Sequence, residues 1–487
     1  LYRSLVFPRL HWLYQLFWNS DAWDPMDYGK EYDFSRPFFE QIRDLYNSVP
    51  WGIMWSMEMK NCDYCACAYS KNCYLCFDSG YDEDSAYNVT LLYSKQSFDC
   101  LNVKDGELCY YCINTNQSYK TYFSRNCTSC IEVWFSQDCI GCTSCFGCSG
   151  LRNKKYYIFN KPYDKSTYEA KLLEMKLDSW SGLQQGRKLS EDVWQKSPVK
   201  YQHSVQVTNS TGDYLYNGTE LINCFFMGTA RNMKHCQSII YPPNNDDMDI
   251  TSSEGTELAY ETICCGNGCH RAIGMVETAN SSDSYYSINC RNVENVFGCV
   301  AIRSKSHCIL NKQYTKEEYF EMLPKIKKHM DEMPYIDKKG RIYRFADFFP
   351  FDMAPHGYSQ SQASEYFPVT EEEAKEKNYR WRIPEDRKYT ITMKTSGIPD
   401  SITEVSDSIL EEVIQCEHEE SGNHSFGCDV DCASAFRITR QELDFYRQAK
   451  LPLPRLCFNC RHIDRVKWRN VPALYHRQCM CENKDHN

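Results

Sequence analysis

The sequence lacks any long uninterrupted apolar segment. Its most apolar stretch, residues 1–18, is broken by two arginines, a proline and a histidine, so no run reaches the about eighteen apolar residues of a membrane helix. The stretch also lacks the charged start, clean apolar run and small-residue cleavage site of a secretory signal. We therefore expect no membrane span and a cytoplasmic location. A surface or extracellular location stays open, because the native chain could begin before Leu1.

The templates of common catalytic sites are also missing. The chain contains no G-x-S-x-G, no P-loop, no H-E-x-x-H and no dinucleotide fingerprint. Cysteine and histidine are neighbours at His235-Cys236 and Cys269-His270, but adjacency in sequence is not the geometry of a nucleophile and its base. We therefore expect that the protein is not an enzyme.

The chain has no excess of positive charge. Its 55 Lys and Arg against 65 Asp and Glu give a net charge of −10, which argues against wrapping nucleic acid with the whole surface. Residues 433–487 differ, because they hold 11 basic and 5 acidic residues. The basic side chains nearest Trp468 are those of Arg461, Arg465, Lys467 and Arg469. If nucleic acid binds, we expect it at this C-terminal end; the alternative is a solvated face beside a metal site.

Cysteine, by contrast, is abundant. The 29 cysteines fall into three groups: 14 in residues 62–148, 8 in 224–308 and 7 in 416–481. The chain is far longer than the small secreted domains that depend on disulfides. We therefore expect reduced thiols that serve as metal ligands or as core residues.

Two segments of the chain are similar to each other. Residues 146–169 and 297–320 align without a gap and share FGC, an Asn-Lys pair and several single positions. The shared single positions are Arg152/Arg303, Lys154/Lys305, Ile158/Ile309, Tyr163/Tyr314, Lys165/Lys316 and Tyr168/Tyr319. Such agreement indicates an internal duplication, and hence two homologous lobes.

Each lobe has the sequence character of a repetitive β structure. A polar residue, often Asn or Asp, precedes Cys or Tyr at intervals of roughly 9 to 15 residues, among β-favouring Tyr, Phe, Val and Ile, with no helical periodicity. Short strands at this spacing are typical of a sandwich or a β-solenoid. The similarity of successive units favours the solenoid, in which compact Cys side chains line a dry interior.

Helical periodicity returns after each lobe. Apolar residues recur at helical spacing in 165–194, and 315–330 opens with the capping-box pair Thr315 and Glu318. Short helices are also expected at 370–377 and 406–414. We predict a mainly β fold of two tandem β-solenoid-like lobes, each followed by an amphipathic helix, plus a C-terminal zinc-ribbon-like module. The predicted parts are an N-terminal extension (1–59), the first lobe with its helix (60–202), the second lobe with its helix (203–333), an irregular extension (334–415) and the zinc-ribbon-like tail (416–487).

The strongest chemical signal is a pair of cysteine knuckles in the tail. Cys428 and Cys432 are followed after 24 residues by Cys457 and Cys460. Two such pairs bring four thiolates around a structural Zn²⁺. Cys416 or His418 lies close enough to replace one member, and the alternative is a set of unligated buried thiols.

A second cysteine motif lies at the end of the first lobe. Cys139, Cys142, Cys145 and Cys148 are each separated by two residues, as in the ferredoxin run that binds an iron–sulfur cluster. The following Pro of that run is missing, and the second lobe keeps only Cys299. We therefore favour stacked solenoid thiols, or a zinc site, over an iron–sulfur cluster.

Three stretches resemble a known family. They are residues 20–41, the FGC element of both lobes, and 364–382 together with 436–462. On these stretches the chain resembles an uncharacterised family of cysteine-rich repeat proteins with terminal zinc-ribbon segments, found in bacteria of the candidate phyla radiation. The resemblance spans nearly the whole chain and implies zinc-ribbon-like ends around a repetitive middle, with no established activity. Relatives carry C-x-x-C where this chain has Tyr14 and Phe17, which implies a remnant or truncated N-terminal ribbon.

Three functions compete at this point. The first is a non-catalytic structural or scaffold protein that associates with itself or binds a protein partner through long faces rich in the 36 tyrosines. The second is a metal-handling or iron–sulfur redox protein that uses the lobe cysteines. The third is an RNA- or ribosome-associated protein that binds through the basic C-terminal ribbon.

Overall fold

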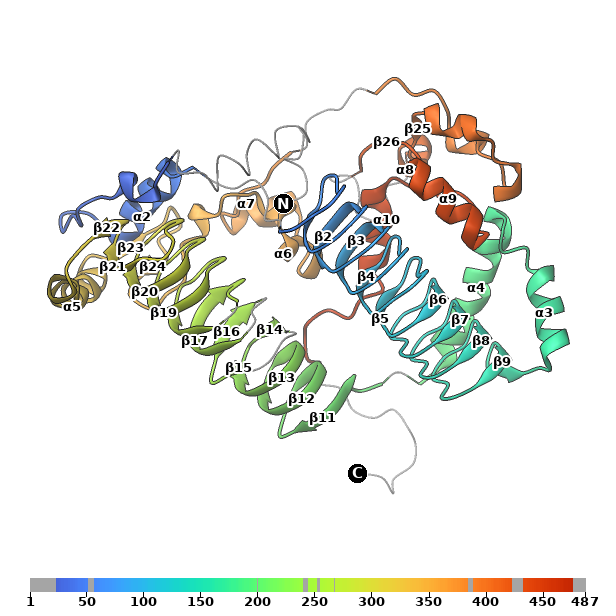
Figure 1. Cartoon of the computed structure of the whole chain (residues 1–487), viewed down its shortest axis with the longest axis horizontal. Helices are drawn as coiled ribbons and strands as arrows, with labels where there is room; N and C mark the ends of the chain where they lie inside the picture. Colours follow the sequence, from blue (N-terminus) through green and yellow to red (C-terminus); the bar gives the residue numbers. More distant parts are fainter. Residues whose placement is uncertain are drawn as a thin grey trace.

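Two stacks of short parallel strands dominate the computed structural model (Figure 1). The structure describes residues 23–50, 57–198, 200–239, 244–251, 255–266, 268–383, 389–422 and 432–475. Sheet is the main element, with 33% of residues in strands and 26% in helices. None of the helices in these ranges combines the length and apolar character needed to cross a membrane. Tyr14 and Phe17, at which the family resemblance implies a remnant or truncated N-terminal ribbon, lie outside the described residues.

The first stack, here called the first ladder, covers residues 57–162. Its strands are β1 (Ala66–Ala68), β2 (Tyr74–Gly80), β3 (Ala86–Leu92), β4 (Leu101–Lys104), β5 (Ile113–Asn116), β6 (Tyr119–Tyr122), β7 (Ile131–Trp134), β8 (Thr143–Phe146), β9 (Lys155–Ile158) and β10 (Lys161–Pro162). From β2 to β9, strands pair in parallel with a register of twelve residues, as in Tyr74 with Ala86 and Thr143 with Lys155. Bridges such as Tyr110 with Tyr122 continue this register between the two halves of the ladder.

The second ladder covers residues 204–313. Its strands are β11 (Ser204–Thr208), β12 (Gly212–Ile222), β13 (Cys224–Lys234), β14 (Gln237–Ile239), β15 (Asn244–Asn245), β16 (Met248–Thr251), β17 (Thr256–Ile263), β18 (Cys269–Ile273), β19 (Ala279–Tyr285), β20 (Arg291–Phe297), β21 (Ser306–Ile309) and β22 (Lys312–Gln313). Most neighbours again pair in parallel twelve residues apart, as in Gly212 with Cys224 and Ala279 with Arg291.

A triplet of residues is the local unit of both ladders. From Asn72 to Phe159 every third residue has a positive φ, and glycine occupies this position only at 141, 147 and 150. Asn and Asp tolerate this left-handed conformation better than most residues, which explains why they recur before the cysteines. The chain bends at each triplet, and four triplets complete one twelve-residue repeat.

The residue after each left-handed position points into the ladder. In the first ladder these inner residues are small or slender, and almost all are buried; examples are Cys100, Val103, Cys109, Cys112, Thr115, Ser118, Thr121 and Ser124. Ser94 shows why polar members fit. Its Oγ donates to the Leu92 carbonyl at 2.9 Å and accepts from Gly106 N, one repeat later, at 3.0 Å. Inner side chains thus satisfy backbone groups that the strand pairing leaves free.

Both ladders end in the same local structure. β9 and β10 form an antiparallel hairpin with Ile158 opposite Lys161, and β21 and β22 repeat it with Ile309 opposite Lys312. In each hairpin the Asn of the Asn-Lys pair turns back onto the preceding repeat. Asn160 Oδ1 accepts from Ser149 N at 2.9 Å, and Asn311 Oδ1 accepts from Val300 N at 2.7 Å.

Helices follow these hairpins. The segment expected to be helical over 165–194 is divided into α3 (Lys165–Glu174) and α4 (Trp180–Lys196), because Ser179 caps a new helix. The helix α5 (Lys316–Glu332) begins with the capping box of Thr315 and Glu318, which confirms that prediction. Lys165 and Lys316 therefore begin equivalent helices.

The N-terminal part packs on the second ladder. It contains the 3₁₀ helix η1 (Pro25–Tyr28) and the helix α2 (Phe38–Ser48). The Phe38 ring lies 5.1 Å from the rings of both Tyr286 and Phe297. Gly298 has a φ of 64°, and a Cβ there would lie 2.8 Å from the Phe38 ring, so the glycine of FGC leaves room for α2.

The region after α5 is a series of short elements. They are β23 (Tyr335–Ile336), β24 (Ile342–Tyr343), η2 (Phe351–Met353), η3 (Tyr358–Gln360), α6 (Gln362–Tyr366), α7 (Glu371–Glu376), η4 (Thr395–Gly397), η5 (Ile402–Glu404), η6 (Asp407–Glu411), β25 (Ile414–Gln415), α8 (Glu417–Ser421), β26 (Ala435–Phe436), α9 (Arg440–Ala449) and α10 (Phe458–Val466). The helix expected at 370–377 is confirmed as α7. In the range expected to be helical at 406–414, residues 407–411 form the 3₁₀ helix η6, and the strand β25 begins at Ile414.

The N-terminal part of the described chain packs on the second ladder, and the C-terminal part packs on the first. Phe345 and Phe349 join α2 in a core with the second ladder, whereas Ile402 and Leu443 join a core with the first ladder. In Figure 1 the red helices α9 and α10 lie beside β2–β5, and the blue helix α2 lies by β22. The C-terminal tail therefore docks on the N-terminal ladder, which brings distant parts of the sequence together.

Candidate metal centre

Four cysteines of the tail meet at one point. Cys416 is the residue immediately before α8, Cys457 is the residue immediately before α10, and Cys460 lies in the first turn of α10. The antiparallel pairing of β25 with β26 brings Cys432 to the same place as Cys416. The starts of two helices and a two-residue strand pair thus position all four thiols.

The spacing of these thiols fits a tetrahedral metal. The Sγ–Sγ distances are 3.8 Å for Cys416 and Cys460, 4.0 Å for Cys432 and Cys457, and 3.4 Å for Cys457 and Cys460. A tetrahedron with metal–sulfur bonds of about 2.3 Å has edges of about 3.8 Å. All four Sγ atoms lie within 4.8 Å of one another, so they could hold a metal ion.

Backbone groups support negative charge on these sulfurs. Cys457 N donates to Cys416 Sγ at 3.3 Å, Ala433 N donates to Cys457 Sγ at 3.4 Å, and Ser434 N to Cys432 Sγ at 3.4 Å. Hydrogen bonds from the neighbouring thiols, first of all that of Cys416, hold the pKa of Cys457 well below its usual range. Thiolates are the form in which cysteine binds metals.

The set differs in one member from the predicted one. Cys432, Cys457 and Cys460 are brought together as expected, and Cys416, predicted as a substitute, completes the group. Cys428 lies outside the described residues. His418 is buried beside the centre without belonging to the group. The structure therefore favours a four-thiol site that includes Cys416.

The centre is tied to the helix that follows the first ladder. Arg455 donates to the carbonyl oxygens of Thr395 and Ile398 at 2.6 and 2.9 Å, and its guanidinium lies over the Trp180 ring of α4. Glu417 N donates to the Arg455 carbonyl at 3.0 Å. These contacts connect the metal centre to α4.

The four cysteines of the ferredoxin-like run are placed differently. Cys139, Cys142, Cys145 and Cys148 are inner residues of one repeat and fully buried. Their thiols face backbone carbonyls two residues earlier, for example Gln137 O at 3.3 Å from Cys139 and Phe146 O at 3.3 Å from Cys148. Among the residues that the structure describes, the group of three or more His, Cys, Asp or Glu residues whose ligand atoms lie within 4.8 Å of one another is the set of four tail cysteines, and Cys139, Cys142, Cys145 and Cys148 do not form such a group. The C-x-x-C spacing here comes from the triplet unit.

The basic residues proposed for nucleic acid are largely interior. Arg461 and Arg465 are 3% and 0% exposed, which contradicts their assignment to a solvent-facing patch. Both pair with Asp99 of the first ladder, at 2.8 Å from Arg461 Nε and 2.7 Å from Arg465 Nη1. Burial opposes the charge of Arg461, but Asp99 raises its pKa above the usual value. The helical pattern of α10 directs these two side chains inward.

The other members of the basic patch also make contacts. The Arg469 guanidinium lies 3.6 Å from the centre of the Tyr366 ring. Trp468 is half-buried, and its ring packs edge-on against Trp194 at 5.6 Å, with Arg125 at 5.0 Å. Lys467 is exposed. The patch is therefore mainly an internal interface between tail and ladder.

Sequence reasoning missed the acidic side of this interface. Glu442 of α9 is buried; it accepts from Tyr87 at 2.9 Å and from Tyr446 at 3.0 Å. Tyr111 donates to Asp464 at 2.7 Å, and Arg187 of α4 pairs with the same carboxylate at 3.0 Å. The sequence of α9 and α10 alternates acidic and basic residues, which is the signal for such an interface. An exposed helix has the same pattern, so the pattern does not show that these charges are buried.

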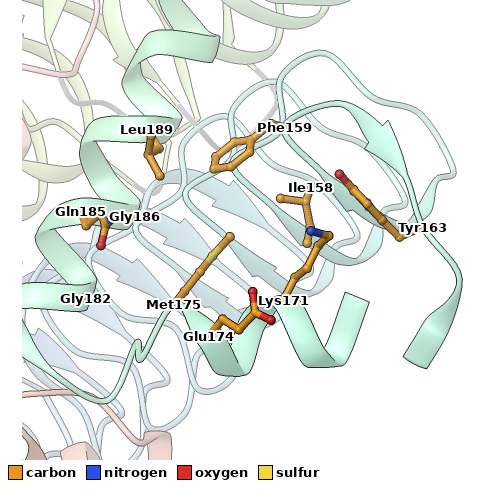
Figure 2. Close-up of a pocket in the computed structure, with 10 residues that line it drawn as sticks. All are labelled: Ile158, Phe159, Tyr163, Lys171, Glu174, Met175, Gly182, Gln185, Gly186 and Leu189. Carbon is orange, nitrogen blue, oxygen red and sulfur yellow. The ribbon is translucent and has the colours of Figure 1, made fainter. Parts of the chain in front are cut away.

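One hollow lies outside the metal centre, between the end of the first ladder and its two helices (Figure 2). Its volume is about 290 Å³. Ile158 and Phe159 of the ladder face Met175 and Leu189, with Lys171 and Glu174 at the rim. The lining is mostly apolar, and its charged members Lys171 and Glu174 do not form a nucleophile–base or metal-ligand group. The tail cysteines are therefore the main candidate functional site.

Comparison with known proteins adds little. No protein-family model matches this chain, and no curated protein matches it. One similar solved structure is a "putative acetyltransferase" from Desulfovibrio desulfuricans G20. The match covers 62% of this chain and 95% of that chain, with 9% sequence identity and a TM-score of 0.12. With so low a TM-score, no statement about fold or activity rests on this likeness.

Proposed function

We propose that the protein is a non-catalytic scaffold made of two β-solenoid lobes that arose by duplication, with a structural zinc ion in the tail. Each ladder would be one lobe, and each twelve-residue repeat would be one coil. The matching ends at Asn160 and Asn311 support the duplication. The resemblance to cysteine-rich repeat proteins fits the same proposal.

The observation that carries the proposal is the use of the ladder thiols. Most inner cysteines are fully buried, and the described ones carry free thiols. They pack against each other and against backbone carbonyls, as Cys112 does with Tyr110 O at 3.5 Å. Such thiols act as compact core residues rather than as reactive groups. Free thiols also support a reducing compartment such as the cytoplasm.

Zinc is our choice of metal for the tail centre because of its ligands. Four thiolates in a tetrahedron are typical of structural zinc and leave no coordination position for water or substrate. Three of the four cysteines are buried. The ion would therefore hold α8, β26 and α10 together and would not take part in a reaction.

The outer faces of the ladders offer the surface that a scaffold needs. Tyr69, Tyr81 and Tyr93 stack with ring centroids 4.8 Å apart and are 40%, 50% and 45% exposed. A column of Lys71, Glu83 and Lys95 runs beside them on the same repeats. Exposed tyrosine columns are effective contact surfaces for proteins. We therefore propose a protein partner or a second copy as the ligand.

Metal analysis of the purified full-length chain tests this proposal. We expect about one zinc per chain, no iron and no inorganic sulfide. Cys460→Ser should abolish the zinc, whereas Cys308→Ser, in the second ladder, should leave it unchanged. Iron with sulfide, or zinc retained by C460S and lost by C308S, would overturn the proposal in favour of a metal-handling protein.

A further inference from the structure

Two columns of side chains meet where the ladders touch. On the first ladder, Asn114 Nδ2 donates to Asn126 Oδ1 at 3.3 Å, and Asp138 occupies the same position one repeat later. On the second ladder, the rings of Tyr214 and Phe226 stack with centroids 4.7 Å apart, and the ring of His203, one residue before β11, stacks on Tyr214 at the same spacing. Tyr214 Oη donates to Asn126 Oδ1 at 2.9 Å, so the aromatic column lies beside the polar one.

His203 lies between two carboxylates at this joint. Its Nε2 is 3.1 Å from Asp138 Oδ1 of the first ladder, and its Nδ1 is 3.3 Å from Asp213 Oδ2 of the second. The three side chains are 9%, 13% and 19% exposed. An imidazole can donate from both ring nitrogens only when it is protonated. The arrangement therefore suits the imidazolium ion.

Other polar and charged groups face the imidazole and its two carboxylates. Lys200 Nζ lies 3.5 Å from Asp138 Oδ1, and Asn470 of the tail donates to Asp213 Oδ2 at 3.2 Å. Arg125 is also close enough to interact electrostatically with Asp138. Lys200 and Arg125 share Asp138 with His203 and, as like charges, oppose the imidazolium, whereas the two carboxylates favour it. Asn126 Nδ2, 3.4 Å from His203 Nε2, and the stacked Tyr214 ring complete its surroundings.

We propose that His203 is a proton-dependent latch that fixes the two ladders against each other. The protonated ring bridges Asp138 and Asp213 and closes the joint. Loss of its proton removes one of the two donors, breaks the bridge between Asp138 and Asp213 and releases the ladders. The latch goes beyond the scaffold role, because it makes the relative placement of the two ladders depend on pH.

The pH range of the latch follows from the groups themselves. Burial opposes the charge on His203, but the hydrogen bonds that the ring donates to Asp138 and Asp213 prevail and raise its pKa to about 9. A raised pKa stabilises the closed joint fully below the ordinary value near 6.5, and this contribution is lost as the pH rises through about 9. The pKa values of both carboxyls are lowered, so the joint also weakens in strong acid.

Hydrogen exchange of the full-length chain tests the latch. Protection of amides in 200–216 should fall about tenfold or more between pH 7 and pH 10, after correction for intrinsic exchange. His203→Gln should show the low protection already at pH 7, with little further dependence on pH. His235→Gln is the matched control, because His235 contacts Asn223 on the exposed face of the second ladder and faces no carboxylate in these contacts.

A second variant separates release of the joint from misfolding. Asp138→Asn keeps the imidazole and changes only the first ladder, so it should shift the release to lower pH while the far repeats, around 279–297, keep their protection. Small-angle scattering should show an increase in the radius of gyration over the same pH range. Protection that is constant from pH 7 to pH 10, or equal in H203Q and the native chain, would overturn the proposal.

Discussion

Arg465 Nη1 lies 2.7 Å from Asp99 Oδ1, and neither side chain is exposed to solvent. The two residues are far apart in sequence, one in α10 of the tail and the other in the first ladder. A buried guanidinium is stable only with a carboxylate partner, so this pair requires the tail to be docked. Folding of the tail and folding of the first ladder are therefore coupled.

Removing Arg465 should release the tail. We expect Arg465→Ala to lower the free energy of unfolding by about 3 kcal/mol, because Asp99 would stay buried with one cation fewer. Urea unfolding and limited proteolysis of 389–475 measure the effect. Arg447→Ala is the control, since Arg447 pairs with Asp407 at the surface and should cost at most about 1 kcal/mol. Equal costs for the two variants would contradict the coupling.

The metal centre should be lost in acid. Protons compete with the metal for thiolates, so the affinity should fall steadily as the pH drops from 8 to 5. Release of zinc to a chromogenic chelator follows this loss. Because α10 carries both Cys460 and Arg465, chelation should also make residues 389–475 more sensitive to protease. A tail that stays protected without its metal would separate the two features.

Cys148 should tolerate serine but not phenylalanine. Its thiol faces the carbonyls of Phe146 and Tyr157 at 3.3 and 3.5 Å, and Ser136 already occupies the same column one repeat earlier. We expect a loss of about 1 kcal/mol for C148S and about 3 kcal/mol for C148F, which overpacks the interior. Thermal unfolding compares the two. Iron–sulfur absorbance near 400 nm that disappears in C148S would instead indicate a cluster.

The two closing asparagines should differ in importance. Asn311 is fully buried and also donates to Pro25 O at 2.9 Å, whereas Asn160 is exposed and bonds only within its own ladder in the contacts seen. We expect Asn311→Ala to cost about 3 kcal/mol and Asn160→Ala about 1 kcal/mol. Denaturant unfolding gives both values. A larger cost at Asn160 would show that the buried contact with the N-terminal part is unimportant.

Much of the local structure was readable from the residue pattern. The Asn or Asp before Cys marks left-handed positions such as Asn126, and the capping pair of Thr315 and Glu318 starts α5. The recurring C-x-x-C spacing already contains the triplet unit. The pattern of polar residues before Cys or Tyr nevertheless predicted a longer interval of roughly 9 to 15 residues, because Ser, Thr and Val occupy many of the inner positions in place of Cys. In Cys139 to Cys148 the same spacing resembled a ligand motif.

The tail shows where such reading ends. Three of its four predicted ligands assemble as expected, while Cys416 joins them through a two-residue strand pair that composition does not predict. Arg461 and Arg465 have the sequence character of an exposed basic patch, yet both are buried and form ion pairs with Asp99. The sequence pattern of a helix that is basic on one face is the same whether that face contacts water or a buried carboxylate.

The order of residues along the chain determined on its own the left-handed triplets of the two cysteine-rich ladders, their closing turns and the capped helix α5, because these depend on backbone preferences over a few neighbouring positions. Only the tertiary structure decided that the tail covers the first ladder, that the N-terminal helix covers the second, and that His203 sits between two carboxylates. Those outcomes depend on complementary charge and shape between surfaces far apart in sequence, and no local preference encodes which surfaces will meet.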